Sequence, residues 1–255
     1  MLTDAQIDEL SRLLKIDRFS VFREYLQLVF LSELYQLAES VEVFFKGGTA
    51  IHLVLHSPRF SEDLDFSTPL AKKEIVPVVS KTVEKIRIQI PQMKVEKLYE
   101  TEKSVRFKLK YQTDLFKYPL SVKIDFQAKE KPALIEKTPL ITQFPMQFFP
   151  IVSRLGNEEI LAEKTAALLT RFKGRDFFDL WFLLTKNIKI NERLIKKKLG
   201  GKGKKFSWAG LSAKIKKMPE KTIEKDLNRF LPAYQRKIVP LLKPELLKIV
   251  EEKMR

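Results

Sequence analysis

Residues 44–67 read FFKGGTAIHLVLHSPRFSEDLDFS, and this stretch decides how the rest of the chain is interpreted. An apolar run ends at two glycines, a short apolar segment follows, and a close pair of aspartates ends the stretch. The pattern predicts a strand over 41–45, a short helix over 49–56 and a second strand over 61–67. A glycine turn that opens a helix lets backbone N–H groups approach a phosphate at the positive end of the helix dipole.

The two aspartates, Asp63 and Asp65, lie on one face of the predicted strand because residues i and i+2 of a strand point the same way. The segment LSVKIDFQ at 120–127 alternates in the same manner and places Lys123 and Asp125 on its polar face. If the two strands are neighbours, three carboxylates converge. Converging carboxylates need a counter-charge, and a hard divalent cation such as Mg²⁺ takes oxygen ligands together with substrate phosphates. The pattern therefore predicts a metal site suited to phosphate chemistry.

Each of these motifs alone is more typical of structure than of function. Two adjacent glycines usually form only a turn, and charges that alternate along a strand usually form a solvated face. Their combination is more specific: a strand, a glycine pair, a helix, a strand with two aspartates and a later strand with a third follow one another in order.

Composition restricts the class of protein. The chain has 255 residues, of which 44% are hydrophobic, so we expect a folded protein with one large or two small domains. No apolar run reaches the ~18 residues needed to cross a bilayer. The N-terminus lacks the layout of a signal peptide, so we expect no membrane association and a cytoplasmic location. The absence of cysteine excludes disulfides, zinc–thiolate sites and thiol nucleophiles.

The hydrophobic patterns predict an α/β (α+β) fold in two lobes. The first lobe, 1–150, combines a small mixed or antiparallel sheet with helices, and the second lobe, 151–255, is a helical bundle. We expect helices over 4–15, 18–39, 71–89, 157–172 and 175–186, and strands over 93–100, 104–112 and 120–127. A proline-rich connection over 131–150 is expected to cross between the lobes.

Positive charge is concentrated in one part of the chain. Residues 186–225 hold fourteen Lys or Arg and three acids, so this segment carries +11 of the formal net charge of +16. A concentrated positive field attracts polyanions, and nucleic acid is the common case, although a solvated surface or an acidic protein partner remains an alternative. The candidate nucleic-acid-binding residues are Lys196, Lys197, Lys198, Lys202, Lys204 and Lys205.

Two later helices carry a second group of charged residues. If one helix runs on through Gly174, a single stripe is formed by Lys164, Leu168, Arg171 and Arg175. Its basic groups would stabilise charge on a leaving pyrophosphate. Asp176 and Asp179 share a helix face and would orient those basic groups or act as general base. The alternative is an internal salt-bridge network that links two helices.

Histidines and aromatic residues offer weaker signals. His52 and His56 have the i, i+4 spacing of a zinc-binding pair, but no third ligand is near in the sequence, so ordinary helix residues are the favoured interpretation. Phe206 and Trp208 lie among lysines and are candidates for base stacking.

The order K-G-G-T-A-I, R-F-S-E-D-L-D-F, K-I-D and E-K-T-A-A-L-L-T-R-F-K-G-R-D-F-F-D-L resembles the AbiEii/AbiGii-type nucleotidyltransferase toxin family. This family is a branch of the polymerase-β-like nucleotidyltransferase superfamily and includes the MenA-type transferases. The motifs extend from residue 46 to about residue 184, just over half of the chain. The glycine and DxD pattern belongs to the whole superfamily, whereas the later Glu-Lys and Arg-Asp helices are more specific to this family.

The resemblance implies a polymerase-β-like nucleotidyltransferase lobe and assigns roles to its residues. Mg²⁺ or Mn²⁺ would be bound by Asp63, Asp65 and Asp125. The catalytic group would consist of these three with Lys164, Asp176 and Asp179. The nucleoside triphosphate would be held by Lys46, Gly47, Gly48, Thr49, Arg59, Ser61, Lys123, Arg171 and Arg175. Thr49 stands where the superfamily often has serine, which keeps a hydroxyl at that position. From about residue 190 onward no motif is matched.

The resemblance further implies transfer of a nucleotide from an NTP to an acceptor hydroxyl. With the basic segment, RNA is the favoured acceptor and the 3′ end of tRNA the leading one. The protein would be the toxin of a type IV-like toxin–antitoxin system, with a cognate antitoxin as partner. Two alternatives stay open: a protein or small-molecule hydroxyl as the acceptor, or a catalytically inactive module that binds nucleic acid.

Overall fold

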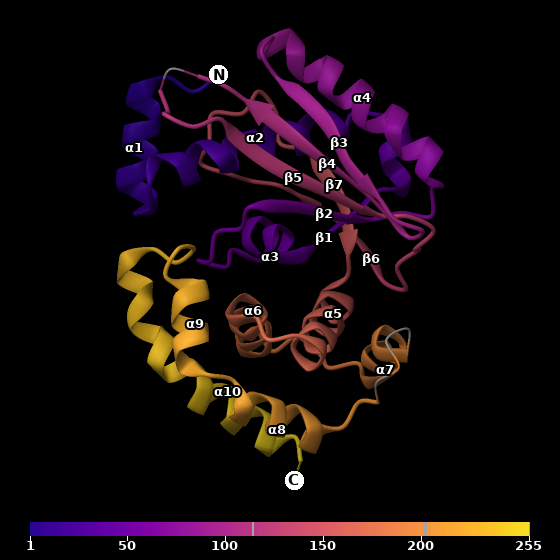
Figure 1. The fold of residues 1–255 in the computed structure, drawn as a ribbon, viewed down its shortest axis with the longest axis vertical. Coiled ribbons are helices and arrows are strands. Elements are labelled where there is room, and N and C mark those ends of the chain that lie inside the picture. The colour runs from indigo at the N-terminus through magenta and orange to yellow at the C-terminus, as the bar shows by residue number, and fades with distance from the viewer. Residues whose placement is uncertain (114, 201–202, 204, 255) are drawn as a thin grey trace. The chain divides into compact units, whose positions relative to one another are not determined.

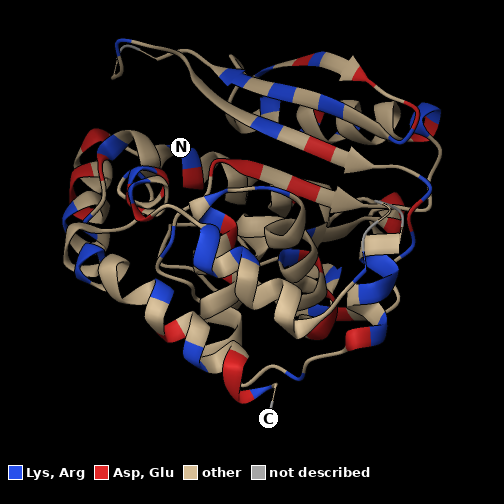
Figure 2. Ribbon diagram, turned by 60° about the horizontal axis from the view of Figure 1, so that its bottom comes forward, with Lys and Arg blue, Asp and Glu red and all other residues tan. Residues whose placement is uncertain are grey.

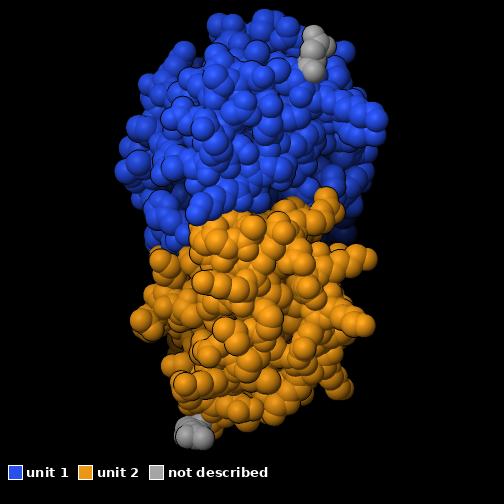
Figure 3. All heavy atoms as spheres, turned by 90° about the vertical axis from the view of Figure 1, so that its left-hand side faces the viewer, with its two compact units in different colours: residues 1–155 blue, residues 156–255 orange. Residues whose placement is uncertain are grey.

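The computed structural model describes residues 1–113, 115–200, 203 and 205–254, and the chain forms two compact units, Met1–Leu155 and Gly156–Arg255 (Figures 1 and 3). The first unit combines a mixed sheet with helices, and the second unit is helical. Unit 1 ends at Leu155, after the last strand of the sheet, rather than at residue 150.

Within the described residues, the sheet of unit 1 has seven strands in the order β3-β4-β5-β2-β1-β7-β6. The pairs β2–β5 and β1–β7 are parallel, and the remaining pairs are antiparallel. The predicted mixed sheet is therefore confirmed. The strands are β1 Phe44–Lys46, β2 Asp63–Ser67, β3 Lys94–Glu100, β4 Ser104–Tyr111, β5 Leu120–Gln127, β6 Ile135–Pro139 and β7 Ile151–Leu155.

Two of these strands were not predicted. β6 lies inside the proline-rich connection, and its last residue, Pro139, is tolerated because β6 is an edge strand. β7 has the sequence IVSRL, whose residues from Val152 to Leu155 are all buried, so it lacks the alternation that marks a half-exposed strand. The predicted start of the helical lobe at residue 151 is therefore wrong, because β7 completes the sheet of unit 1.

The first two helices of unit 1 begin at N-cap residues whose side chains accept a hydrogen bond. The helices of this unit are α1 Asp4–Leu14, α2 Arg18–Leu34, the short 3-10 helix η1 Ala38–Glu42, α3 Gly47–Leu55 and α4 Lys72–Gln89. The predicted N-cap of α2 is confirmed, because the Asp17 side chain accepts a hydrogen bond from the Ser20 amide. η1 occupies residues predicted to begin a strand, so β1 is short and starts at Phe44. Pro77 lies inside α4.

The sheet has one apolar and one polar face. On the apolar face Leu64 and Phe66 of β2 lie beside Ile124 and Phe126 of β5, and all four are fully buried. They join one core cluster with residues of α2 and α4, which pack against each other. The polar face carries the candidate site. Figure 2 shows acidic and basic residues side by side on neighbouring strands of the sheet.

Unit 2 consists of helices joined by short connections. They are α5 Asn157–Thr170, α6 Gly174–Thr185, α7 Glu192–Gly200, α8 Trp208–Lys217, α9 Glu220–Leu227, η2 Ala233–Leu241 and α10 Leu242–Glu252. α5 ends at Thr170, and Arg171 has extended backbone angles, so no helix runs on through Gly174. The predicted single stripe is therefore wrong. The break is fixed by packing, because a Cβ at Gly174 would lie 2.8 Å from the Ile223 Cα of α9.

Candidate active site

Three neighbouring strands, β4, β5 and β2, build the polar face in two parallel rows. Arg106, Asp125 and Asp65 form one row of register partners, and Lys108, Lys123 and Asp63 form the next row. Register partners on adjacent strands have side chains on the same face. The strand adjacency on which the sequence argument depended is therefore confirmed, and Asp65 lies opposite Asp125 on the parallel pair β2–β5.

Asp125 is engaged by Arg106, which sequence reasoning did not single out. The Arg106 Nε donates to the Asp125 Oδ2 at 2.8 Å, and Nη2 donates to the same oxygen. The guanidinium carbon also lies 4.8 Å from the ring centre of Tyr99. Partial burial acts to lower the pKa of Arg106, but the hydrogen bonds and charge of Asp125, with the charges of Tyr99 and Asp63, raise that pKa overall.

The three aspartates share a face, but they do not form a closed cluster. Among the residues that the structure describes, no group of three or more His, Cys, Asp or Glu side chains is gathered closely enough to hold a metal ion. The Asp125 carboxylate is instead directed to Arg106. The strand register thus places the three aspartates on one face as predicted, but their side chains do not converge on one point.

The glycine turn lies directly against the aspartates. Gly47 has φ +80°, a left-handed conformation that favours glycine, and a Cβ there would lie 2.2 Å from the Asp65 Oδ2. A Cβ at Gly48 would lie 2.4 Å from the Arg59 Nη2 and 3.0 Å from the Ser61 Oγ. A side chain at either glycine would therefore force these neighbouring side chains to move. The two glycines bring the first turn of α3, which has no side-chain cap, against Asp65, Arg59 and Ser61.

Several residues predicted to contact the nucleotide instead support this turn through hydrogen bonds within the protein. Thr49 is fully buried and its hydroxyl donates to the Asp63 carbonyl oxygen, so it fastens α3 to β2 and does not face a phosphate, contrary to its predicted role. Arg59 is 2% exposed and its Nη1 donates to the Phe60 carbonyl oxygen at 2.9 Å. The Lys46 Nζ donates to the Gln127 Oε1 at 2.8 Å and lies 3.3 Å from the Glu130 Oε2.

The charged residues predicted on the later helices form an ion-pair network around two buried aspartates in unit 2. The Lys164 Nζ lies 2.7 Å from the Asp179 Oδ2 and 3.3 Å from the Asp176 Oδ1. Arg171 donates to both oxygens of Asp176, at 2.6 and 2.9 Å. Asp176 and Asp179 are both buried. This is the salt-bridge arrangement that was the structural alternative, and it links α5 to α6.

The network makes Asp176 a weak proton acceptor. Burial acts to raise the pKa of Asp176, but the charges and hydrogen bonds of Lys164 and Arg171 hold that pKa below its ordinary value. A general base works best with a pKa near the working pH. The geometry therefore favours an orienting or stabilising role for Asp176 over proton removal, and the catalytic role of Lys164 stays a prediction. Arg175 lies over the Phe230 ring, with 5.1 Å from its guanidinium carbon to the ring centre.

The predicted nucleic-acid-binding lysines differ in how accessible they are. Lys196, Lys197 and Lys205 are exposed. Lys198 is not available as predicted, because its Nζ lies 2.9 Å from both Glu159 Oε1 and Glu163 Oε1 of α5. The predicted residues Lys202 and Lys204 lie outside the described residues.

Trp208 is anchored rather than presented to solvent as an open stacking surface. Its Nε1 donates to the Glu192 Oε1 at 2.9 Å, and its ring meets Phe206 edge-on with 5.1 Å between ring centres. Trp208 also lines a pocket of about 660 Å³ between the end of α6 and the end of α10.

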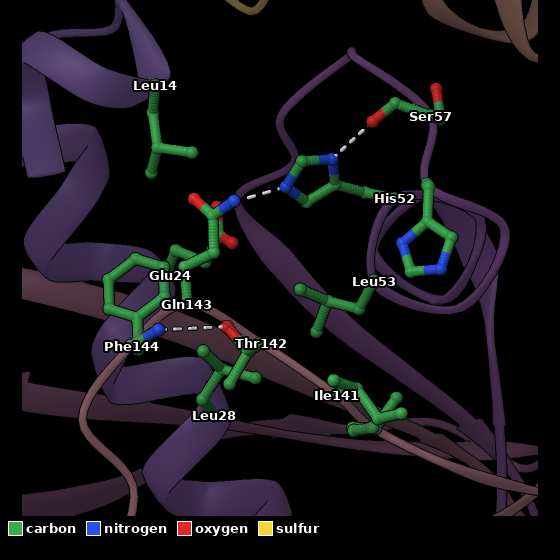
Figure 4. Close-up of a pocket in the computed structure, with 12 residues that line it drawn as sticks. Leu14, Glu24, Leu28, His52, Leu53, Ser57, Ile141, Thr142, Gln143 and Phe144 are labelled. Carbon is green, nitrogen blue, oxygen red and sulfur yellow. Dashed lines mark hydrogen bonds and ion pairs between the residues drawn. The ribbon is translucent and has the colours of Figure 1, made fainter.

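The two histidines of the i, i+4 pair have different surroundings. His52 lies in the wall of a pocket of about 410 Å³ beside Glu24, and Figure 4 shows both side chains with Ser57. The His52 Nε2 lies 3.0 Å from the Glu24 Oε2, and its Nδ1 lies 2.5 Å from the Ser57 carbonyl oxygen. His56 is exposed and has φ +57°. The ordinary structural interpretation of the pair is therefore supported.

Comparison with known proteins identifies the class. The sequence matches the family described as nucleotidyl transferase AbiEii toxin, type IV TA system, over residues 29–250. The chain belongs to this family of nucleotidyltransferase toxins, as the sequence motifs indicated. It is therefore an enzyme of the nucleotidyltransferase class.

Individual relatives agree with this assignment. The chain is 29% identical over 174 residues to the uncharacterised protein aq_aa25 of Aquifex aeolicus (strain VF5), which covers 66% of this chain and 71% of that protein. The fold is similar to that of MenT4, a nucleotidyltransferase toxin of Mycobacterium tuberculosis H37Rv, with a TM-score of 0.66 and 20% identity over 98% of this chain and 89% of that chain. It is also similar to JHP933 of Helicobacter pylori, with a TM-score of 0.53 and 19% identity over 94% of this chain and 96% of that chain. At these identities the two structures support the fold.

Within the described residues, no helix combines the length and the apolar character that a membrane span needs.

Proposed function

We propose that unit 1 binds a nucleoside triphosphate with a divalent cation on the polar face of its sheet and transfers the nucleotide to an acceptor hydroxyl. The observation that carries the proposal is the contact between Gly47 and Asp65. A Cβ on Gly47 would reach within 2.2 Å of the Asp65 carboxylate, so the backbone that suits a phosphate lies directly beside the residue that suits a cation.

The donor set fits Mg²⁺ or Mn²⁺. Asp63 and Asp65 project from one face of β2, Asp125 is the register partner of Asp65, and all three offer carboxylate oxygens, the ligands that these hard cations prefer. All three are partly exposed, as a site that admits a substrate requires. When bound, the cation would supply charge stabilisation for the triphosphate and the leaving pyrophosphate.

The surrounding residues of the chain bind and orient the triphosphate. The first N–H groups of α3, whose N-cap residue Lys46 makes no side-chain cap hydrogen bond, offer hydrogen bonds to phosphate oxygens, and the helix dipole adds a favourable potential there. Ser61 lies beside Gly48, and Lys123 is the exposed register partner of Asp63, so both are placed to contact the nucleotide from the same face. Lys46, Thr49 and Arg59 support the site indirectly, because their side chains hold the strand and the turn in place.

We propose RNA as the acceptor, with the 3′ end of tRNA as the leading candidate. The exposed lysines Lys196, Lys197 and Lys205 belong to the segment that carries +11, and such a field favours a polyanion. A toxin of this family has an antitoxin as partner, and modification of RNA would take place in the cytoplasm.

The test is transfer of label from each of the four α-labelled NTPs to total RNA, with Mg²⁺, followed by separation of RNA from protein. Label on RNA that is lost with Asp63→Asn supports the proposal and identifies the nucleotide. Label on protein would show that the acceptor is a protein and not RNA. Nucleotide binding without transfer to any acceptor would instead indicate an inactive binding module.

A further inference from the structure

Asp125 lies between a basic and an acidic residue on the neighbouring strands. In its row across the sheet, Arg106 of β4 is on one side and Asp65 of β2 is on the other. Strands in a sheet are about 4.8 Å apart, so the Asp125 side chain is within reach of both neighbours. In the structure it is directed to Arg106, whose Nε and Nη2 both donate to Oδ2.

We infer that Arg106 competes with the divalent cation for Asp125, so that the third carboxylate joins the site only after the Arg106–Asp125 pair opens. This inference rests on the proposed metal site. Two observations carry it. The described residues contain no closed group of three acidic or histidine side chains, and the third candidate carboxylate, Asp125, forms an ion pair with a guanidinium. A carboxylate oxygen that accepts two charged hydrogen bonds is a poorer ligand until those bonds are released.

Arg106 has a second partner that makes this release feasible. Its guanidinium carbon lies 4.8 Å from the centre of the Tyr99 ring, the register partner of Arg106 on β3. A cation–π contact of this kind gives the guanidinium a favourable partner other than Asp125. The side chains of Arg106 and Asp125 are 31% and 21% exposed, so the pair is shielded from water only in part. A partly exposed pair is weak enough to open when a stronger ligand competes.

The neighbouring row offers a matched control. Lys108 of β4 is the register partner of Lys123, which in turn is the register partner of Asp63. Lys108 therefore occupies the same place in the row of Asp63 that Arg106 occupies in the row of Asp65. Its neighbour on β5, however, is another lysine and not a carboxylate. Lys108→Gln removes one positive charge from the same face and measures the general electrostatic effect on cation affinity.

The experiment measures the affinity of the full chain for Mn²⁺ without nucleotide, by electron paramagnetic resonance and by calorimetry. Arg106→Gln is expected to bind Mn²⁺ about fivefold more tightly than the parent protein, as loss of a partly exposed ion pair allows. Lys108→Gln is expected to change the affinity by less than about twofold, because its charge is screened by water and salt. In an Asp125→Asn background, Arg106→Gln is expected to change the affinity no more than Lys108→Gln does.

Two results overturn the inference in different ways. If Arg106→Gln binds Mn²⁺ no better than Lys108→Gln does, or binds it more weakly than the parent, Arg106 does not compete with the cation, while the metal site itself stands. If the parent protein shows no Mn²⁺ binding that Asp63→Asn abolishes, the proposed metal site fails, and this inference fails with it. Circular dichroism of each variant verifies that the fold is retained.

Discussion

Asp65 lies at the meeting point of two structural motifs: it is the register partner of Asp125 on β5, and its Oδ2 occupies the space where a Cβ on Gly47 would lie. One side chain thus joins the strand pair that carries the carboxylates to the turn that opens α3. A phosphate at the turn and a cation at the carboxylates would therefore be neighbours, which is the arrangement that nucleotide transfer requires.

Gly47→Ala is expected to reduce transfer activity at least about tenfold. The new methyl group would displace the Asp65 carboxylate, and the left-handed backbone would add a cost of roughly 1–2 kcal/mol in stability. Gly203→Ala is the matched control, because Gly203 also has positive φ, +64°, and no atom of the described residues lies within 4 Å of its Cβ position. That variant should lose stability but keep activity. Transfer kinetics and urea unfolding measure both effects, and full activity of Gly47→Ala would show that its contact with Asp65 is irrelevant to the reaction.

Lys164→Ala is expected to lower the free energy of unfolding by about 3–5 kcal/mol, because it removes the cation that lies between two buried carboxylates. The comparison is Lys196→Ala. Lys196 pairs with Glu192 on the surface, with its side chain 58% exposed, and its loss should cost less than about 1 kcal/mol. Urea unfolding of both variants measures the difference. Similar stability losses in the two variants would contradict the structural role of the network.

The pair His52–Glu24 predicts a pH dependence of stability in unit 1. Burial acts to lower the pKa of His52, but the charge and hydrogen bond of Glu24 and the Ser57 carbonyl raise it above its ordinary value of 6.5. Because the folded pKa is the higher one, the stabilisation is fully present below about pH 6.5 and is lost as the pH rises through the raised pKa.

Glu24→Gln is expected to abolish this loss of stability at rising pH, since burial then dominates and lowers the pKa of His52. His56→Asn should leave the pH dependence unchanged, because His56 is exposed and asparagine tolerates its positive φ. Urea unfolding between pH 6 and 9 and NMR titration of the two histidines of the chain provide the measurement. A parent protein whose stability rises over this range would contradict the assignment.

The local patterns of the site could be predicted from the sequence. Alternation placed Leu64 and Phe66 in the core and Asp63 and Asp65 on the opposite face, and the glycine pair marked the turn before α3. These features depend on neighbouring residues, so the chain carries the signal locally.

Features that depend on distant partners were missed or were wrong. β7 pairs with β1 across about a hundred residues and has no alternation of its own. The pairing of Arg106 with Asp125 follows from the register of β4 against β5, which the sequence does not state. Gly174, at the start of α6, approaches α9 closely, and the break before it means that helical spacing alone wrongly joined Arg175 to the stripe of Lys164 and Arg171.

The central claim is nucleotidyl transfer at Asp63 and Asp65, and its most direct test follows the two ends of the triphosphate separately. NTP labelled at the α or at the γ phosphate is incubated with RNA, Mg²⁺ and the parent protein, Asp63→Asn, Asp65→Asn or Glu62→Gln. Glu62 is the control, because it is the adjacent acid and pairs with Arg23 at 2.9 Å.

The account predicts α label on the acceptor and γ label in released pyrophosphate, with a loss of at least about 100-fold in each aspartate variant and little change in Glu62→Gln. Transfer of γ label to the acceptor, or full activity of an aspartate variant that has kept its fold, would contradict it.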